Sequence, residues 1–255
     1  MFKIVTTGWN CVEFAEQTLR SIEDQTCRDF QVSIAYESAT PYGSGEGEKL
    51  LDIITQVAIG QVLVEIREPG HYLHDVHTRY EATMATEPED DDIIVTLDLD
   101  GDTFAHPDVL AHLLDYYADD TLLTYGNYEP VPPDPGCPPV LAYPEGVVAA
   151  RSYRAFREVR FNHLRTMKGR VFKAIPPEQF QFAAGPKKGQ WYTKGNDVEF
   201  TFCGLELVGR RFKVIDEVLL HYNSINPNSN WRIAPRETDE CIADFFNRPP
   251  LEELP

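Results

Sequence analysis

Apolar residues in the first hundred positions follow two alternating periodicities. Short runs rich in β-branched residues have the length of buried strands, and we expect strands at 2–6, 31–36, 62–66 and 93–97. Between them, apolar residues three or four positions apart predict amphipathic helices at 11–24, 46–59 and 76–85. Strands that alternate with helices at this spacing are typical of βαβ units with right-handed crossovers. The sequence therefore predicts an α/β fold, with a mainly parallel sheet flanked by helices.

The pattern after residue 100 is less regular. We expect helices after Pro107 and from Gly195, and strands at 121–125, 212–215 and 218–222. The stretch 129–145 contains seven prolines, so it cannot be regular structure. It is either a plain connector or a loop that lines a binding site. Segment 151–173 is basic, and we favour pairing with acidic side chains over binding of phosphates.

Composition narrows the possible partners and the compartment. The formal net charge of −18 over 255 residues disfavours a nucleic-acid backbone or an anionic membrane as partner. No apolar stretch is long enough to span a membrane, and the chain begins without a signal-peptide pattern. Five scattered cysteines without a CxxC pair fit a reducing compartment. We therefore expect a cytoplasmic protein.

The most informative stretch is the strand 93–97 with the acids that follow it. Asp98, Asp100 and Asp102 come directly after this apolar run. Carboxylates held close together raise one another's pKa, and a hard divalent cation relieves this repulsion. In open α/β sheets, ligands bind at the carboxyl ends of strands. The stretch therefore predicts a metal site that holds a phosphate, although acids and glycine after a strand also form simple turns.

Several motifs, in order along the chain, resemble those of the inverting family 2 glycosyltransferases. Thr6–Asn10 followed by Leu19–Thr26 is similar to the family's first strand and helix, and Leu97–Asp100 resembles its DxD motif. Three more segments resemble family motifs: Ala35–Ser38 the Val-Asp-Asp-Gly motif, Asn196–Asp197 the Glu-Asp motif, and Leu219–Tyr222 the closing strand with its His. The family's Asn-x-Gly…Ala-Arg-Asn segment is represented only by Gly70–Tyr80. The chain departs from the family at Tyr36, Glu37 and Asn196, which replace Asp, Asp and Glu.

The resemblance implies a GT-A fold, the Rossmann-like fold of nucleotide-diphospho-sugar transferases. The expected reaction moves a sugar, with inversion, from a nucleotide diphosphate sugar to a hydroxyl of a glycan or another acceptor. Because the base-binding acid is Glu37, a UDP-type donor is favoured. The expected cofactor is Mn²⁺ or Mg²⁺, with Asp98, Asp100 and His221 as its ligands. Asp197 is the expected general base, with Glu199 in reserve. The nucleotide-binding residues implied are Thr6, Thr7, Glu37, Arg79 and Asp98.

We expect one GT-A domain over 1–255. It comprises a nucleotide-binding half (1–126), an acceptor half (127–222) and a C-terminal segment that wraps the surface (223–255). One alternative is a catalytically decayed module that binds nucleotide or glycan, because Tyr36 and Asn196 depart from the motifs. A less favoured alternative is a sugar-phosphate nucleotidylyltransferase. That enzyme class needs a Gly-rich basic loop after the first strand, which Thr7–Asn10 does not provide.

Overall fold

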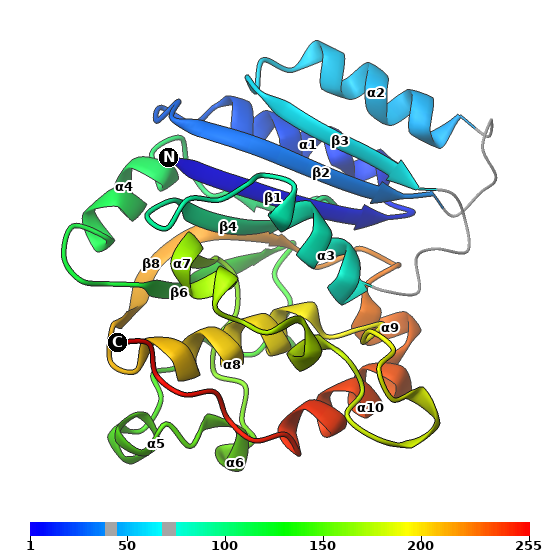
Figure 1. The fold of residues 1–255 in the computed structure, drawn as a ribbon. Helices are drawn as coiled ribbons and strands as arrows, with labels where there is room; N and C mark the ends of the chain where they lie inside the picture. The colour runs from blue at the N-terminus through cyan, green and yellow to red at the C-terminus, as the bar shows by residue number, and fades with distance from the viewer. Residues whose placement is uncertain (39–44, 68–74) are drawn as a thin grey trace.

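The computed structural model describes residues 1–38, 45–67 and 75–255, and a single eight-stranded sheet runs through them (Figure 1). The spatial order is β3-β2-β1-β4-β7-β6-β8-β5. The strands are β1 (Phe2–Trp9), β2 (Phe30–Glu37), β3 (Val62–Arg67), β4 (Ile93–Asp98), β5 (Thr103–Phe104), β6 (Leu123–Val131), β7 (Arg165–Lys168) and β8 (Phe212–Asn223). Strand β7 is antiparallel to both β4 and β6, and β5 is antiparallel to β8, whereas the other ladders are parallel. The remaining six strands therefore end at the same edge of the sheet.

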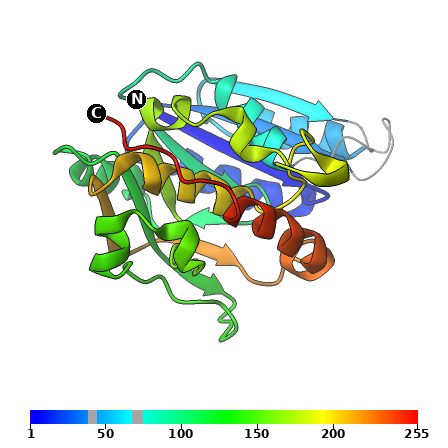
Figure 2. The same cartoon turned by 60° about the horizontal axis from the view of Figure 1, so that its bottom comes forward.

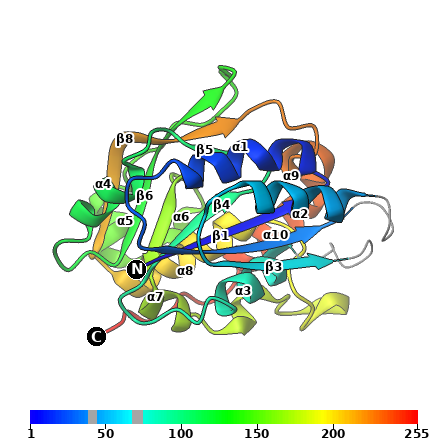
Figure 3. The same ribbon diagram turned by 90° about the horizontal axis from the view of Figure 1, so that it is seen from above.

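Helices cover both faces of this sheet (Figure 3). One face carries α1 (Val12–Glu23), α2 (Glu46–Gln56) and α4 (Val109–Tyr116). The other carries α3 (Asp75–Met84), α7 (Gly169–Lys173) and α8 (Asn196–Val208). The shorter or later helices are α5 (Glu145–Ala150), α6 (Tyr153–Phe156), α9 (Asn230–Ile233) and α10 (Pro235–Phe246).

Two hydrophobic cores lie on the two faces of the sheet. Neighbouring residues of a strand point to opposite faces, so Ile4 packs in the core with α1, and Val5 packs in the core with α8. Ile93 and Ile94 are divided in the same way. Burial on both sides explains why these strands are continuous apolar runs rather than alternating patterns. Each fully buried side chain of this size contributes about 1.5–3 kcal/mol, which fixes the central strands firmly.

The predicted α/β class is confirmed, but the second half of the sheet differs from the prediction. The residues expected as two strands at 212–215 and 218–222 form one strand, β8, whose pairing with β6 is irregular between Gly126 and Tyr128. Strand β7 lies inside the segment interpreted as basic and was not predicted, because Arg165–Lys168 has no apolar run. The start of the segment Gly70–Tyr80, which resembles a family motif, lies outside the described residues.

The C-terminal segment returns to the second core. After α10, the chain (red in Figures 1 and 2) runs back along α8, and Leu254 N donates to Leu207 O at 2.8 Å. The backbone carbonyl of Leu254 in turn accepts from the Arg211 guanidinium. Across the described ranges, we find no helix that is both long and apolar enough to cross a membrane.

Candidate functional site

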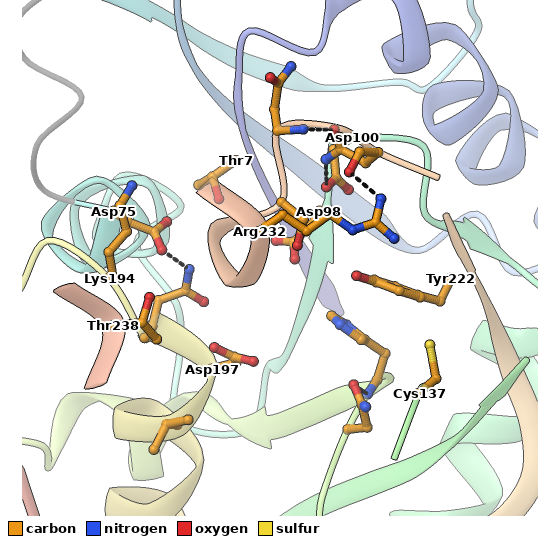
Figure 4. A pocket seen from close by; sticks show the side chains of 18 of the residues that line it. Thr7, Asp75, Asp98, Asp100, Cys137, Lys194, Asp197, Tyr222, Arg232 and Thr238 are labelled. Atoms are coloured by element: carbon orange, nitrogen blue, oxygen red, sulfur yellow. Dashed lines mark hydrogen bonds between the residues drawn. The ribbon is translucent and has the colours of Figure 1, made fainter. Parts of the chain in front are cut away.

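A cavity of about 670 Å³ opens where the parallel strands end. Its lining includes the ends of β1, β2 and β4 through Thr7, Glu37 and Asp98. Tyr128 of β6 and Tyr222 of β8 form the opposite wall. Figure 4 shows several of these side chains, with Asp98 and Asp100 close together and Asp197 apart from them. Ligands bind at this edge in open α/β sheets, so the cavity lies where the fold predicts a site.

Three acids lie at and just after the end of β4, and two of them, Asp98 and Asp100, line the cavity. Asp98 forms an ion pair with the buried Arg79, and Asp100 accepts a hydrogen bond from the Asn226 amide through Oδ2 at 2.5 Å. Asp102 lies behind them, fully buried, and its Oδ1 accepts from the backbone N–H of Asn223 at 2.9 Å. Because Asn223 and Asn226 belong to the C-terminal segment, that segment holds the acidic loop in place.

Several polar atoms of this cluster have no hydrogen-bond partner among the described residues. They are Asp100 Oδ1, Asp102 Oδ2 and His163 Nδ1, and all three are buried. Ligand atoms of Asp98, Asp102 and His163 lie within 4.8 Å of one another. A buried polar atom without a partner is costly, and a cation bound within this group would provide one to the Asp102 and His163 atoms. The residues present therefore fit a divalent metal ion.

Burial and mutual repulsion divide the protonation states of the cluster. Burial, followed by the charge of Asp98, raises the pKa of Asp100 to about 7, and burial raises that of Asp102 well above its usual range. Burial also opposes ionisation of Asp98, but the Arg79 guanidinium holds its pKa below the ordinary value. Burial and the nearby Arg165 lower the pKa of His163 to about 4. His163 is therefore neutral at pH 7, which is the form that binds metal.

Glu37 lies at another part of the cavity, at the end of β2. It is only 4% exposed, and its Oε1 accepts from the Thr78 hydroxyl at 2.7 Å. Arg67 lies 3.9 Å from the same oxygen. Burial raises the pKa of Glu37 despite these two contacts. Asp75 and Lys194 line the cavity nearby, and the Asn196 amide donates to Asp75 at 2.7 Å. This region offers acceptors to a ligand that carries N–H groups.

Asp197 occupies the first turn of α8. Gly195 precedes this helix with a φ of +95°, a conformation that favours glycine and that brings the helix start to the cavity. The Asp197 side chain is 35% exposed, and its Oδ2 lies 3.4 Å from Arg165 Nη1. A carboxylate in the first turn is stabilised by the helix dipole. Asp197 is thus a reachable carboxylate, separate from the acidic cluster.

Four of the predicted site residues do not line the cavity. Thr6 is fully buried and precedes Thr7, which does line it. Arg79 is buried and does not line the cavity, but it forms an ion pair with Asp98, which does. Glu199 is fully buried, because residues two apart on a helix lie about 200° apart around its axis and Asp197 occupies the cavity side.

His221 is also outside the cavity and outside the acidic cluster. It pairs with Thr103 in the β5–β8 ladder, and its neighbour Tyr222 lines the cavity. Successive strand residues point to opposite faces, so His221 is directed away from the wall that Tyr222 forms. His163 takes the place beside the acids that the sequence prediction gave to His221.

The structure adds residues that sequence reasoning missed. His163 stacks on Tyr222, with ring centroids 5.6 Å apart, and lies in the segment interpreted as basic. Arg232 of α9 also lines the cavity, and its guanidinium donates to the backbone carbonyls of Ser224 and Asn226. Local periodicity assigns a site role to neither, because both reach the site through long-range folding of irregular segments.

The basic segment mainly forms ion pairs, whereas part of the proline-rich stretch lines the cavity. Arg170 and Lys173 pair with exposed acids, as expected. Arg154 instead makes a buried pair with Glu206 at 2.7 Å. In the proline-rich stretch, Gly136–Pro139 line the cavity, so this loop is more than a connector.

No known family model matches the sequence, and a comparison with curated proteins finds no match. Solved structures do match it. TarS of S. aureus superposes with a TM-score of 0.60 at 14% identity, over 94% of this chain and 38% of TarS. The chain thus spans well under half of the full TarS chain. A shorter TarS piece, residues 1–349 with UDP-GlcNAc, gives a TM-score of 0.59 at 11% identity, over 98% of this chain and 68% of that one.

Two further neighbours were solved with a nucleotide sugar and Mn²⁺. The mannosyltransferase PcManGT from Pyrobaculum calidifontis, with GDP-Man, matches with a TM-score of 0.52 at 13% identity, over 85% of this chain and 54% of that one. Glucosyl-3-phosphoglycerate synthase from Mycobacterium tuberculosis, with UDP-Glc, gives a TM-score of 0.51 at 12% identity, covering 98% and 80%. The chain therefore has the GT-A-like fold of these glycosyltransferases, as the sequence predicted.

Proposed function

We propose that this protein is a metal-dependent glycosyltransferase. It transfers a sugar from a nucleotide diphosphate sugar, with a UDP-type donor favoured, to a hydroxyl of a glycan or another acceptor. The observation that carries the proposal is the arrangement of the cavity. One wall holds a cluster of acids with unpaired buried oxygens, and a separate reachable carboxylate, Asp197, lies across from it.

The metal is proposed to be Mn²⁺ or Mg²⁺, held by the acidic cluster. Asp98, Asp100 and His163 line the cavity, and Asp102 lies behind it. Asp102 and His163 have unpaired ligand atoms, and mixed oxygen and nitrogen ligands suit Mn²⁺. A bound ion would stabilise the negative charge that develops on the departing diphosphate. Arg79 orients the Asp98 carboxylate through their ion pair and limits the net negative charge of the cluster. Arg232 places one further positive charge in the cavity lining.

Asp197 is the proposed general base. Its half-buried carboxylate accepts the proton of the acceptor hydroxyl as that oxygen attacks the anomeric carbon, and the diphosphate leaves from the other face of the sugar. A single displacement of this kind inverts the anomeric centre. Arg165, 3.4 Å away, holds the carboxylate in position.

Glu37 is the proposed contact for the nucleotide base. A buried carboxylate at the end of β2 accepts a hydrogen bond from the imide N–H of uracil, and Thr78 orients it from the other side. The neighbours solved with UDP-GlcNAc and UDP-Glc support a donor of this type, although the mannosyltransferase was solved with GDP-Man. On the remaining wall, Gly136–Pro139 and Phe161 are proposed to face the acceptor.

The direct test is slow hydrolysis of the donor in the absence of an acceptor. Wild-type protein is incubated with UDP-glucose, UDP-GlcNAc or GDP-mannose, with Mn²⁺ or with a chelator, and the release of nucleoside diphosphate is followed. We expect release with Mn²⁺ and none with chelator. A module that only binds nucleotide would bind UDP without releasing it from any donor, and that result would remove the transferase proposal.

A further inference from the structure

A second group of metal-binding side chains lies outside the cavity, where α4 approaches β8 (Figure 3). His106 follows β5, His112 lies in α4, and Glu217 lies in β8. One ligand atom from each is within 4.8 Å of the other two. None of the three residues lines the cavity, so this group is separate from the acids of the proposed active site.

The spacing of these atoms is close to that of a tetrahedral metal site. Glu217 Oε1 lies 3.3 Å from His106 Nε2 and 2.9 Å from His112 Nδ1, and the two imidazole rings are 5.1 Å apart. Zinc binds such ligands at about 2.0–2.1 Å, which places neighbouring ligand atoms of a tetrahedron about 3.3 Å apart. Small side-chain shifts would therefore bring all three ligands onto one ion.

The chemistry of the group selects a different metal from the active site. Two imidazoles and one carboxylate favour Zn²⁺ and its neighbours over Mg²⁺ or Mn²⁺, which prefer oxygen-rich ligands. The side chains of His106, His112 and Glu217 are 31%, 45% and 36% exposed, so solvent reaches the remaining coordination position. We propose that His106, His112 and Glu217 form a second metal site, which binds one Zn²⁺ independently of the nucleotide-sugar cavity.

A hydrogen-bonded cluster without metal is the competing explanation. The backbone N–H of Asp108 lies 3.3 Å from His106 Nδ1, an arrangement that leaves the imidazole proton on Nε2, facing Glu217. Zinc binding at Nε2 requires the proton to move to Nδ1, which gives up this long contact. Little is lost, because a hydrogen bond at this distance is weak. The two explanations therefore differ in one measurable property, which is the affinity for zinc.

Zinc at this position would join β8 to α4 and to the segment that precedes it, and both parts of the chain also lead to the proposed active site. Strand β8 carries Tyr222 into the cavity, and His106 is four residues after Asp102. Helix α4 and strand β8 are already linked by the His112–Glu217 contact, and by Lys213, whose Nζ donates to the Tyr116 carbonyl at 2.9 Å. A bound ion would strengthen the link at His112 and Glu217 and raise the melting temperature, because it binds the folded chain.

Calorimetric titration with zinc chloride tests the proposal on the full chain. The active-site cluster is itself expected to bind zinc, so three variants are compared with wild type: His112→Ala, Glu217→Gln and His163→Ala. We expect one zinc equivalent that survives in His163→Ala. In His112→Ala and Glu217→Gln, the affinity for this zinc ion should fall by at least roughly 10–100-fold. That is the usual cost of losing a group that only supports a metal ligand. Magnesium chloride should give no heat at this site.

His112 and Glu217 are partly exposed, so His112→Ala and Glu217→Gln should fold. Near-wild-type melting temperatures in a chelator would verify this. If zinc stoichiometry and affinity are the same in wild type, His112→Ala and Glu217→Gln, the cluster is only hydrogen-bonded and the proposal is overturned. This outcome is independent of the proposed transferase function, because donor hydrolysis does not enter the measurement.

Discussion

Asp197 and Glu199 both lie in the first turn of α8, yet the helix gives them opposite environments. Asp197 reaches the cavity, and Glu199 is fully buried with both carboxylate oxygens lacking a hydrogen-bond partner among the described residues. Burial raises the pKa of Glu199 well above its ordinary value, which favours the neutral form of this acid. A fully enclosed carboxyl group also cannot contact an acceptor hydroxyl, which leaves Asp197 as the base that we propose.

Replacement of Asp197 by Asn separates catalysis from binding. We expect turnover to fall by roughly 10²–10⁴-fold, the usual contribution of a positioned base, while UDP and Mn²⁺ affinity stay close to wild type. Steady-state kinetics and calorimetry on the same variant measure the two quantities. The matched control is Glu199→Gln, which keeps the shape of a neutral acid and should retain turnover. Near-wild-type turnover in Asp197→Asn would show that this carboxylate is not the base.

Glu37 should distinguish between pyrimidine bases. Uracil carries an imide N–H that a carboxylate accepts, whereas cytosine presents an unprotonated nitrogen at that position. We expect UDP to bind more tightly than CDP by about 1–3 kcal/mol, since the acceptor loses its solvent on binding. Competition binding with both nucleotides measures this difference, and Glu37→Gln should reduce it. Equal affinity for UDP and CDP would remove Glu37 from the site.

Most predicted site residues that line the cavity lie at or near the end of a strand or the start of a helix. Asp98, Asp100, Glu37 and Asp197 all have such positions, and all four line the cavity. A motif does not determine on which face of a helix or strand the residues beside it lie. His221 and Glu199 are each next or close to a residue that lines the cavity, but do not line it themselves. His163 and Arg232 depend on tertiary contacts of irregular chain, which local periodicity does not report.

At the scale of elements, β8 places Tyr222 at the cavity and His221 outside it, which is why we propose His163 as the histidine of the site. Tyr222 lines the cavity, and His221 points to the opposite face of the sheet. His163 stacks on Tyr222 beside the acids. We expect His163→Ala to weaken Mn²⁺-dependent UDP binding, because a neutral nitrogen ligand is lost. His221→Ala should leave it unchanged. Calorimetry of UDP binding with Mn²⁺ on both variants measures this difference. Weaker binding in His221→Ala with unchanged binding in His163→Ala would indicate that His221 is the ligand.

The central strands and their helices were predictable because buried parallel strands are continuous apolar runs. Strand β7 was not, since its sequence Arg165-Thr166-Met167-Lys168 contains one apolar residue. It is nevertheless buried, and partners elsewhere make this possible. Thr166 bonds to Thr124 and Tyr117, and Arg165 pairs with Asp197. Polar strands of this kind are stabilised by their surroundings rather than by their own pattern.

At the scale of the whole molecule, buried acids in an already acidic protein affect stability. Burial raises the pKa of Asp100, Asp102 and Glu199. Such a group binds its proton more strongly in the folded chain than in the unfolded one. Its contribution to stability is therefore present at low pH and is lost as the pH rises through the folded pKa, about 7 for Asp100.

We therefore expect the metal-free protein to melt at a lower temperature at about pH 8 than at about pH 5.5. Each kcal/mol lost lowers Tm by roughly 2–4 °C in a chain of this size. Thermal denaturation in a chelator measures the trend, and Mn²⁺ should restore part of the loss at the higher pH. Asp102→Asn keeps the hydrogen bond from Asn223 N but cannot ionise, so its pH dependence should be shallower. A melting temperature that rises over this interval would contradict the account.

We propose that the acidic cluster holds a metal ion that in turn holds the donor diphosphate. Calorimetry of UDP binding, with Mn²⁺ and with a chelator, in wild type and Asp100→Asn tests this arrangement. We expect Mn²⁺ to strengthen UDP binding in wild type and this gain to disappear in Asp100→Asn, because one anionic ligand becomes neutral. The same Mn²⁺-dependent gain in both proteins, or equal wild-type affinity with Mn²⁺ and chelator, would contradict it.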